Sequence, residues 1–219
     1  MRRIFRSETQ TELPLLEERA RNLTEAGKIL VEEYENSFVN FLKKGNHSAK
    51  QLLELIVTTF PSFKDEAKFD GQRISFYKRA QILIADIWAC FEGVGFGLFP
   101  DINFLTMFAD YKVPQSLLYL GVLKYSPNLM KKLREGEEIS PCDRLELEIR
   151  ANSIWAVQCI NLAIKKMILS HESLNKLTEN DLALILNSVI IDFYLWDFAK
   201  ENLDNRTDLP CHKTRTIFY

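Results

Sequence analysis

The chain has 219 residues, of which 47% are hydrophobic and 26% are charged, and this balance excludes a disordered or fibrous protein. Its 28 basic and 30 acidic residues give a net charge of -2, which argues against a dominant contact with nucleic-acid phosphates. The N-terminus lacks an apolar run long enough for a signal peptide, and no later window approaches a membrane span, so we expect a soluble, intracellular protein. We interpret residues 1–219 as a single domain, because no repeat or clear linker divides them.

The four cysteines, Cys90, Cys142, Cys159 and Cys211, lie far apart in the sequence. None forms a CxxC pair, and only Cys211 stands next to a histidine, so a zinc site is not expected. Free, mostly buried thiols in a reducing compartment are the simplest interpretation.

Most long segments show the three- and four-residue apolar spacing of amphipathic helices, so the sequence predicts an all-α fold. Residues 13–44 are expected to form one long or two shorter helices, and residues 48–60 a further helix that ends before Pro61. Residues 72–76, QRISF, are the one candidate for a short strand.

Residues 75–91 are predicted to form a helix with one face in the core. Its apolar stripe contains Phe76, Tyr77, Ala80, Leu83, Ile84, Ile87, Trp88 and Phe91. Its other face carries Lys78, Arg79, Gln81 and Asp86. Residues 92–102, EGVGFGLFPDI, are rich in glycine and predict a turn. The lone GxG in this turn is only a weak sign of phosphate binding, because no strand precedes it and no GxGxxG follows.

The stretch FADYKVPQSLLYL contains a predicted break between two elements. Pro114 disfavours the helical region for the residue before it, yet it suits the first turn of a new helix. Asp110 therefore lies just ahead of a helix start. If this segment is extended, Phe108 and Asp110 point to one side, so that a ring and a carboxylate face one cavity. The alternative is that Asp110 simply caps the helix or holds Lys112.

The C-terminal part contains two further helices. Residues 140–169 are predicted to form a long helix with Ser140 as its N-cap. Residues 190–200, IIDFYLWDFAK, are apolar but carry Asp192 and Asp197. Because burying an isolated ionised carboxylate is costly, these acids are either satisfied within the protein or face a molecule that it binds. The internal partners would be Lys78, Arg79 or Arg150.

Five strings, SFYKRAQILIADIW, LTMFADYKVPQ, LGVLKYS, IIDFYLWDFA and PCHKTRTIFY, together resemble the queuosine salvage proteins, the queuosine 5'-phosphate N-glycosylase/hydrolase family. The resemblance extends over nearly the whole chain in the same order. It implies a helical fold related to the DNA glycosylases. It also implies an enzyme that cleaves the N-glycosidic bond of queuosine 5'-monophosphate and releases queuine for tRNA modification. No metal or organic cofactor is expected.

The resemblance also implies roles for particular residues. Asp110, in the FAD tripeptide, is the expected catalytic carboxylate, and Phe108 is expected to line the base pocket. Asp192, Trp196 and Asp197, in a D-x-x-x-W-D arrangement, are expected to contribute to base binding. Chemistry agrees, because cleavage builds positive charge on the sugar, which an ionised carboxylate can stabilise or attack. Queuine carries donor groups and an amine-bearing arm, which suit carboxylate acceptors and aromatic faces.

Family members are expected to carry a further N-terminal region that supplies part of the pocket, including a histidine. This chain is therefore interpreted as N-terminally shortened, with apolar surface exposed where that region would pack. Its own histidines, His47, His171 and His212, do not fall where that role would be carried over. Lys112 stands where the family usually has arginine, so the planar fork of a bidentate contact is lost.

Two other functions stay open at this point. A shortened chain could bind queuine or a partner chain without catalysis. A nucleic-acid glycosylase is suggested only by fold analogy and is disfavoured by the near-neutral charge. The expected ligands are therefore queuosine 5'-monophosphate and queuine, with no membrane contact and no direct nucleic-acid binding.

Overall fold

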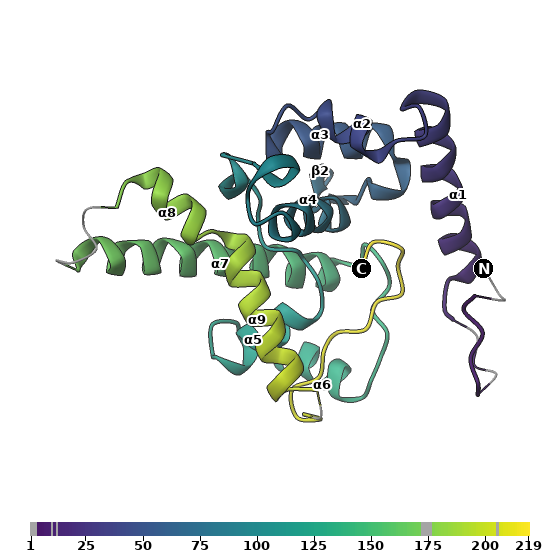
Figure 1. The fold of residues 1–219 in the computed structure, drawn as a ribbon. Coiled ribbons are helices and arrows are strands. Elements are labelled where there is room, and N and C mark those ends of the chain that lie inside the picture. Colours follow the sequence, from purple (N-terminus) through teal and green to yellow (C-terminus); the bar gives the residue numbers. More distant parts are fainter. Residues whose placement is uncertain (1–3, 10, 12, 172–176, 205) are drawn as a thin grey trace.

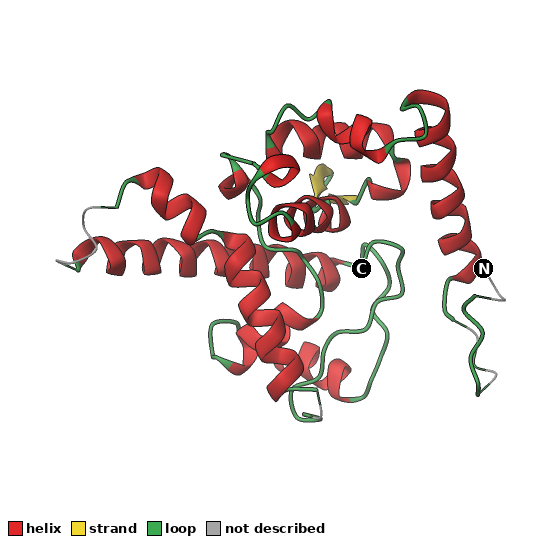
Figure 2. Ribbon diagram, viewed as in Figure 1, coloured by secondary structure: helices red, strands yellow, loops and turns green. Residues whose placement is uncertain are grey.

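The computed structural model describes residues 4–9, 11, 13–171, 177–204 and 206–219. Figure 1 shows helices grouped around one long helix, α7, and Figure 2 shows that strands make up only a small hairpin. The predicted helical fold is therefore confirmed, whereas its likeness to the DNA glycosylases stays a prediction.

The α-helices, in chain order, are α1 (Leu16–Glu33), α2 (Phe38–Lys43), α3 (Ala49–Thr59), α4 (Lys78–Cys90), α5 (Lys112–Tyr119), α6 (Pro127–Arg134), α7 (Arg144–Ser170), α8 (Glu179–Ile185) and α9 (Ser188–Asn202). Three 3-10 turns are η1 (Pro61–Phe63), η2 (Gly95–Gly97) and η3 (Ile102–Phe104). The strands β1 (Glu66–Phe69) and β2 (Gln72–Ser75) pair antiparallel, so the predicted strand at residues 72–76 is confirmed as β2.

The region 13–44 forms two helices. Glu35 and Asn36 separate them, with φ values of 55° and 58° that a helix cannot accommodate. The side chains of Ser37 and Ser48 accept backbone N–H groups in the first turns of α2 and α3. These caps satisfy donors that have no partner within the helix.

Helix α4 begins at Lys78 and not at residue 75. Phe76 and Tyr77 both donate their backbone N–H groups to the carbonyl of Asp65, so the chain does not become helical directly after β2. Tyr77 has a φ of 50°, in the left-handed region, and the chain enters the helix only after it.

The start of α7 differs from the prediction, whereas the start of α5 agrees with it, with Asp110 just ahead of the helix and Pro114 in its first turn. The N-cap of α7 is Asp143 and not Ser140, because the Asp143 carboxylate accepts the N–H of Leu145 at 2.8 Å. Helix α5 begins at Lys112, two residues before Pro114. Pro114 is tolerated because the first turn of a helix does not need its missing N–H.

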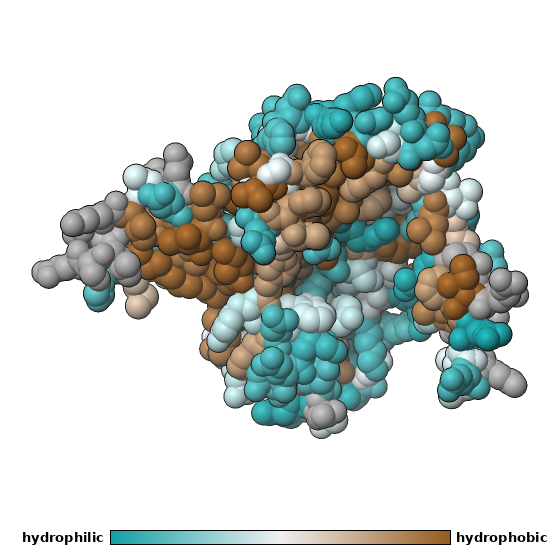
Figure 3. Space-filling model, in the orientation of Figure 1, coloured by the Kyte–Doolittle hydropathy of each residue, from teal (hydrophilic) through white to brown (hydrophobic). Residues whose placement is uncertain are grey.

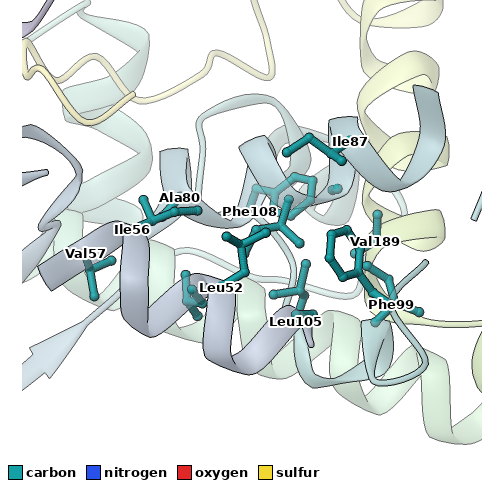
Figure 4. Packing of buried hydrophobic residues seen from close by; sticks show 14 of the residues in the cluster. Leu52, Ile56, Val57, Ala80, Ile87, Phe99, Leu105, Phe108 and Val189 are labelled. Carbon is teal, nitrogen blue, oxygen red and sulfur yellow. The ribbon is translucent and has the colours of Figure 1, made fainter. Parts of the chain in front are cut away.

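The main core lies between α3, α4 and the segment that precedes α5. Leu52 and Ile56 of α3 pack in one cluster with Leu105, Phe108 and, from α9, Val189 (Figure 4). A second cluster joins α5, α7 and α9, where α5 packs along α9. The segment before α5 contributes residues to both clusters, so its position is fixed by packing from both sides.

One stretch has the composition of a membrane span. Asp181–Asn202 is long enough to cross a membrane and has a mean hydropathy of 1.6. The prediction that no window has the length and composition of a membrane span is therefore wrong. However, half of it is buried within the protein, and α8 and α9 are separated at Asn187. A buried core helix meets the same criterion, and α9 forms part of the second core cluster.

Exposed apolar side chains gather over α7 and α8, where Figure 3 shows a broad hydrophobic area. They include Trp155, Leu162, Met167 and Leu169 of α7 and Leu184 and Ile185 of α8. The link between this surface and a further N-terminal region stays a prediction.

The four cysteines are free. The prediction that they are mostly buried is wrong, because Cys90, Cys142 and Cys159 are exposed and Cys211 is half-buried. Cys90 and Cys159 lie on solvent-facing positions of α4 and α7, and Cys142 lies in the turn before α7.

Candidate active site

Residues 105–110, ahead of α5, form a segment without regular secondary structure. Helix side chains hold its backbone through three hydrogen bonds: from Thr106 N–H to Gln81 of α4 at 2.8 Å, from Phe108 N–H to Asp192 of α9 at 2.8 Å, and from Arg150 of α7 to the Ala109 carbonyl at 3.0 Å. Three helices therefore position the backbone that leads into Asp110.

Gln81, predicted on the polar face of α4, is buried instead. Its amide nitrogen donates to the carbonyl of Phe76 at 2.9 Å, and its amide oxygen accepts the N–H of Thr106 at 2.8 Å. The helical pattern cannot show this, because Gln81 is buried to satisfy backbone groups of other segments.

Asp110 is 4% exposed and lies at the start of α5. Its Oδ1 accepts the N–H groups of Lys112 and Val113 at 3.0 and 2.9 Å. Asp110 therefore caps α5, as the alternative interpretation of this residue predicted. The Lys112 side chain instead pairs with Asp204. No hydrogen bond within the described residues involves Asp110 Oδ2, so this oxygen remains for a ligand. Capping and ligand binding are therefore compatible.

Asp192 is 3% exposed, and its Oδ2 accepts the N–H of Phe108. Burial raises the pKa of Asp192 well above the ordinary value, and the negative charge of Asp110 raises it further. Burial also raises the pKa of Asp110, but the N–H of Val113 and the charge of Lys78 oppose this effect. The two carboxyl groups are thus electrostatically coupled, and the charge of Asp110 is the better stabilised of the two, because it accepts two backbone N–H groups.

Lys78 is a cation of this site, and the sequence analysis named it only as a possible internal partner of Asp192 and Asp197. Burial lowers the pKa of Lys78, whereas the charges of Asp110 and Asp192 raise it. The helical pattern placed Lys78 on the outer face of α4. Because side chains tilt toward the N-terminus of a helix, the first residue of α4 can instead extend beyond the helix start. Its position in the first turn is the signal that could have indicated this.

The alternative prediction, that basic side chains within the protein neutralise and hydrogen-bond Asp192, is confirmed only in part. Lys78 acts on Asp192 through its charge, but the hydrogen-bond donor is the Phe108 backbone. The other two candidates are engaged elsewhere: Arg150 pairs with Asp65 and Glu146, and Arg79 donates to the carbonyls of Ser62 and Ile217.

The structure brings Phe108, Asp110 and Asp192 together. The ring of Phe108 is buried in the main core and lies 6.1 Å from that of Phe193, so the residue's link to the two acids is its backbone N–H. Trp196 follows Asp192 by one helical turn but is 41% exposed. Asp197 is exposed on α9. Base binding by Phe108, Trp196 and Asp197 stays a prediction.

A buried ionic network supports the segment around Asp110. Arg150 is 3% exposed and pairs with Asp65 at 2.5 Å and Glu146 at 3.3 Å. Glu146 also accepts the hydroxyl of Tyr219 at 2.8 Å. Next to Tyr219, burial and the charge of Arg150 lower the pKa of His212 to about 4, so this histidine is neutral at physiological pH. The network ties α7 to the C-terminal tail and to the Ala109 carbonyl.

A cavity of about 440 Å³ lies between α1, the start of α4 and the C-terminal tail. Lys78 lines it and is the residue that links it to the two carboxylates. Within the described part of the chain, no three His, Cys, Asp or Glu side chains are grouped so that they could hold a metal ion.

We expect Asp192→Asn to raise the melting temperature of the free protein at neutral pH. The amide oxygen can still accept the Phe108 N–H, while the buried charge next to Asp110 is removed. Because the pKa of Asp192 is raised by folding, the folded state binds this proton more tightly, and stability is lost as the pH rises through the folded pKa. The gain in melting temperature should therefore be largest at neutral pH and vanish in acid. Each kcal/mol gained in the free energy of unfolding should raise the melting temperature by about 2–4 °C.

Calorimetry from acidic to neutral pH would measure this difference. Asp197→Asn is the matched control, because it makes the same change at an exposed position of α9 and should leave the melting temperature close to that of the parent. An Asp192→Asn gain that is the same at every pH would contradict the prediction.

The whole chain, residues 1–219, matches the family model described as "Queuosine salvage protein". It is 58% identical over 219 residues to the queuosine 5'-phosphate N-glycosylase/hydrolase of Nematostella vectensis, covering 100% of this chain and 63% of that protein. It is 49% identical over 219 residues to the protein of the same name from Mus musculus, covering 100% and 62%. For the one from Schizosaccharomyces pombe the identity is 40% over 226 residues, covering 99% and 60%. The chain thus spans less than two thirds of the length of these curated relatives.

Proposed function

Because the chain belongs to the queuosine salvage protein family, we propose that it is an N-glycosidase that hydrolyses queuosine 5'-monophosphate and releases queuine. The observation that carries this proposal is the buried pair of carboxyl groups, Asp110 and Asp192, next to Lys78. Asp110 presents a carboxylate oxygen that no other described group engages. The named activity of the relatives supports the same reaction.

In the proposed reaction, the bond between the sugar C1' and the base nitrogen breaks, and its electron pair leaves with the base, which takes up a proton. Water supplies the hydroxyl group that C1' gains. Asp110, ionised and fixed by two backbone N–H groups, either stabilises the positive charge on the sugar or attacks C1'. Both routes need the same oxygen.

Asp192 has the more easily protonated carboxyl group of the pair, because burial and Asp110 both raise its pKa. In the proposal it recognises the base, and a positively charged arm of queuine favours its ionised form. Phe108, Trp196 and Asp197 complete the base site in this proposal, with Trp196 covering the ring from the exposed side of α9.

We include in the proposal that queuine passes to tRNA modification, that the protein acts in the cytoplasm, and that it binds neither nucleic acid nor a membrane directly. Four free cysteines support a reducing compartment. The net charge of -2 supports the absence of a phosphate-tracking surface.

The test is to incubate the purified chain with queuosine 5'-monophosphate and to detect queuine by liquid chromatography and mass spectrometry. Release of queuine is the expected result. A folded chain that releases none, yet is stabilised against heat by queuine, would replace the enzyme with a binding protein. Salt-sensitive binding to DNA or RNA would favour the nucleic-acid alternative.

A further inference from the structure

The C-terminal tail, residues 206–219, contains no helix and is drawn in yellow in Figure 1. It lines two cavities. One, of about 390 Å³, is lined by the tail together with Tyr111, the residue after the proposed catalytic carboxylate. The other is the cavity of about 440 Å³ that Lys78 lines. Thr216 and Tyr219 line both cavities, so the two adjoin at the tail. The tail is therefore a wall of the space beside the carboxylate pair.

This wall carries a buried polar atom that the fold leaves unpaired. His212 is 4% exposed and lines the cavity of about 390 Å³. Its Nε2 lies 3.4 Å from the hydroxyl of Tyr219, whereas its Nδ1 has no hydrogen-bond partner among the described residues. Because buried polar atoms are normally hydrogen-bonded, Nδ1 is suited to pair with a molecule in the cavity. Such pairing requires the tail to be held in one position.

Gln115 of α5 holds the first half of the tail from within the protein. It is 4% exposed. Its Nε2 donates to the carbonyl of Leu203, at the end of α9, at 3.3 Å and to that of Leu209 at 2.7 Å. Its Oε1 accepts the thiol of Cys211 at 3.0 Å. Both N–H donors and the carbonyl oxygen of this amide are therefore used on the segment that leads into the wall.

The other contacts of the tail are of a different kind. The N–H of Ile139 donates to the carbonyl of Lys213 at 2.8 Å and so fixes the second half. In the first half, Arg134 donates to the carbonyl of Asp208 at 3.4 Å from an exposed position. Water competes for such a surface bond, whereas the bonds of Gln115 are shielded from it. Gln115 is thus the buried attachment of the first half.

Gln115 does not hold the proposed catalytic carboxylate itself. Asp110 accepts the N–H groups of Lys112 and Val113, and the amide of Gln115 is directed to the tail. Loss of this amide should therefore loosen the tail and leave Asp110 in place. The two effects can be separated by measuring substrate binding and turnover independently.

We propose that Gln115 is a positioning residue for substrate binding, because its amide fixes the C-terminal tail as the wall that contacts the bound nucleotide. The assignment rests on the proposed function. A tail released from α5 would occupy the binding position for only part of the time, and the apparent affinity falls by that fraction. In the bound state the wall is restored and Asp110 is unchanged. Gln115 therefore acts on KM and not on kcat.

Gln115→Met tests the role, because methionine has a similar length but no amide. We expect the KM for queuosine 5'-monophosphate to rise about tenfold, as for the loss of buried hydrogen bonds of ordinary strength, while kcat stays close to that of the parent. Ser116→Ala is the matched control. Ser116 is buried on the same helix, but its hydroxyl donates to the carbonyl of Leu195 of α9 at 2.7 Å and not to the tail. This variant should leave KM near the parent value.

A second measurement reports on the tail without turnover. Iodoacetamide labelling, resolved by peptide mass spectrometry, should modify Cys211 faster in Gln115→Met than in the parent or in Ser116→Ala, because the half-buried thiol loses its attachment. The exposed thiols of Cys90, Cys142 and Cys159 are internal references, and their labelling rates should stay unchanged. If Gln115→Met does not fold, Gln115→Asn takes its place with the same expected directions, since its amide lies on a side chain one carbon shorter.

Unchanged labelling of Cys211, or a loss in kcat as large as the rise in KM, would overturn the positioning role. A parent that releases no queuine would remove the proposed function, and calorimetric titration with queuosine 5'-monophosphate would then decide on Gln115. Weaker binding by Gln115→Met together with faster labelling of Cys211 would keep the role. Equal binding by the parent and Gln115→Met would overturn it.

Discussion

Replacing Asp110 by asparagine is expected to abolish the release of queuine from queuosine 5'-monophosphate while leaving the fold intact. Asparagine keeps an oxygen that can accept the N–H groups of Lys112 and Val113, so the cap on α5 is retained. It removes the negative charge that Asp110 would present to the sugar. The expected loss in kcat is at least about 10²–10³-fold, which is typical when one preorganised electrostatic group is removed.

Asp101 provides a matched control for this experiment. Its carboxylate also caps a helix, because it accepts the N–H groups of Ala49 and Lys50 at 2.7 and 3.1 Å at the start of α3. Asp101→Asn therefore makes the same chemical change at a cap outside the candidate site, and queuine release should stay close to that of the parent. Circular dichroism and melting temperature would verify that both variants are folded. Full release by Asp110→Asn would remove Asp110 from the catalytic role.

The position of Asp110 could be predicted from local sequence alone. Pro114 marks a helix start, and an acid a few residues earlier can cap it. The same local rule placed Phe108 and Asp110 outside a helix, which the structure confirms. The start of α7 shows the limit of this reasoning, because Ser140 and Asp143 are both acceptable caps by type, and only the backbone conformation of Cys142, with a φ of 64°, selects the second.

The partners of the buried charges could not be predicted in this way. Asp65 and Arg150 are 85 residues apart in the sequence and share no pattern, yet they form a bidentate pair. The hydrogen-bond donor to Asp192 is the backbone N–H of Phe108, 84 residues away in the sequence. Periodicity identifies which face of a helix is apolar, but it does not show which polar residue is buried to satisfy another segment.

Removing Arg150 is the substitution expected to cost the most stability. Its guanidinium group donates to both oxygens of Asp65, at 3.1 and 2.5 Å, and to Glu146 at 3.3 Å. It also lies 4.0 Å from the centre of the Phe76 ring and 4.6 Å from that of Tyr219. Arg150→Met would leave two buried carboxylates without their cation. Such a loss typically lowers the free energy of unfolding by about 3–5 kcal/mol, and urea unfolding would measure it.

Arg144→Met on the same helix separates the effect of burial from the effect of losing an ion pair. Arg144 pairs with Asp70 and Glu148, both at 2.8–2.9 Å, but its side chain is 61% exposed. Water screens such pairs, so this variant should lose only about 0–1 kcal/mol. Equal losses in Arg144→Met and Arg150→Met would show that the buried network contributes no more than a surface pair.

Arg150 also has an effect on the site that stability alone would not reveal. Its Nε holds the carbonyl of Ala109 at 3.0 Å, directly before Asp110 in the chain. Arg150→Lys keeps the charge but not the planar arrangement of donors, so it should recover part of the lost stability without restoring this contact. A kcat that stays low in folded Arg150→Lys would then identify Arg150 as a positioning residue for Asp110. A kcat that returns to the parent value would limit its role to the stability of the fold.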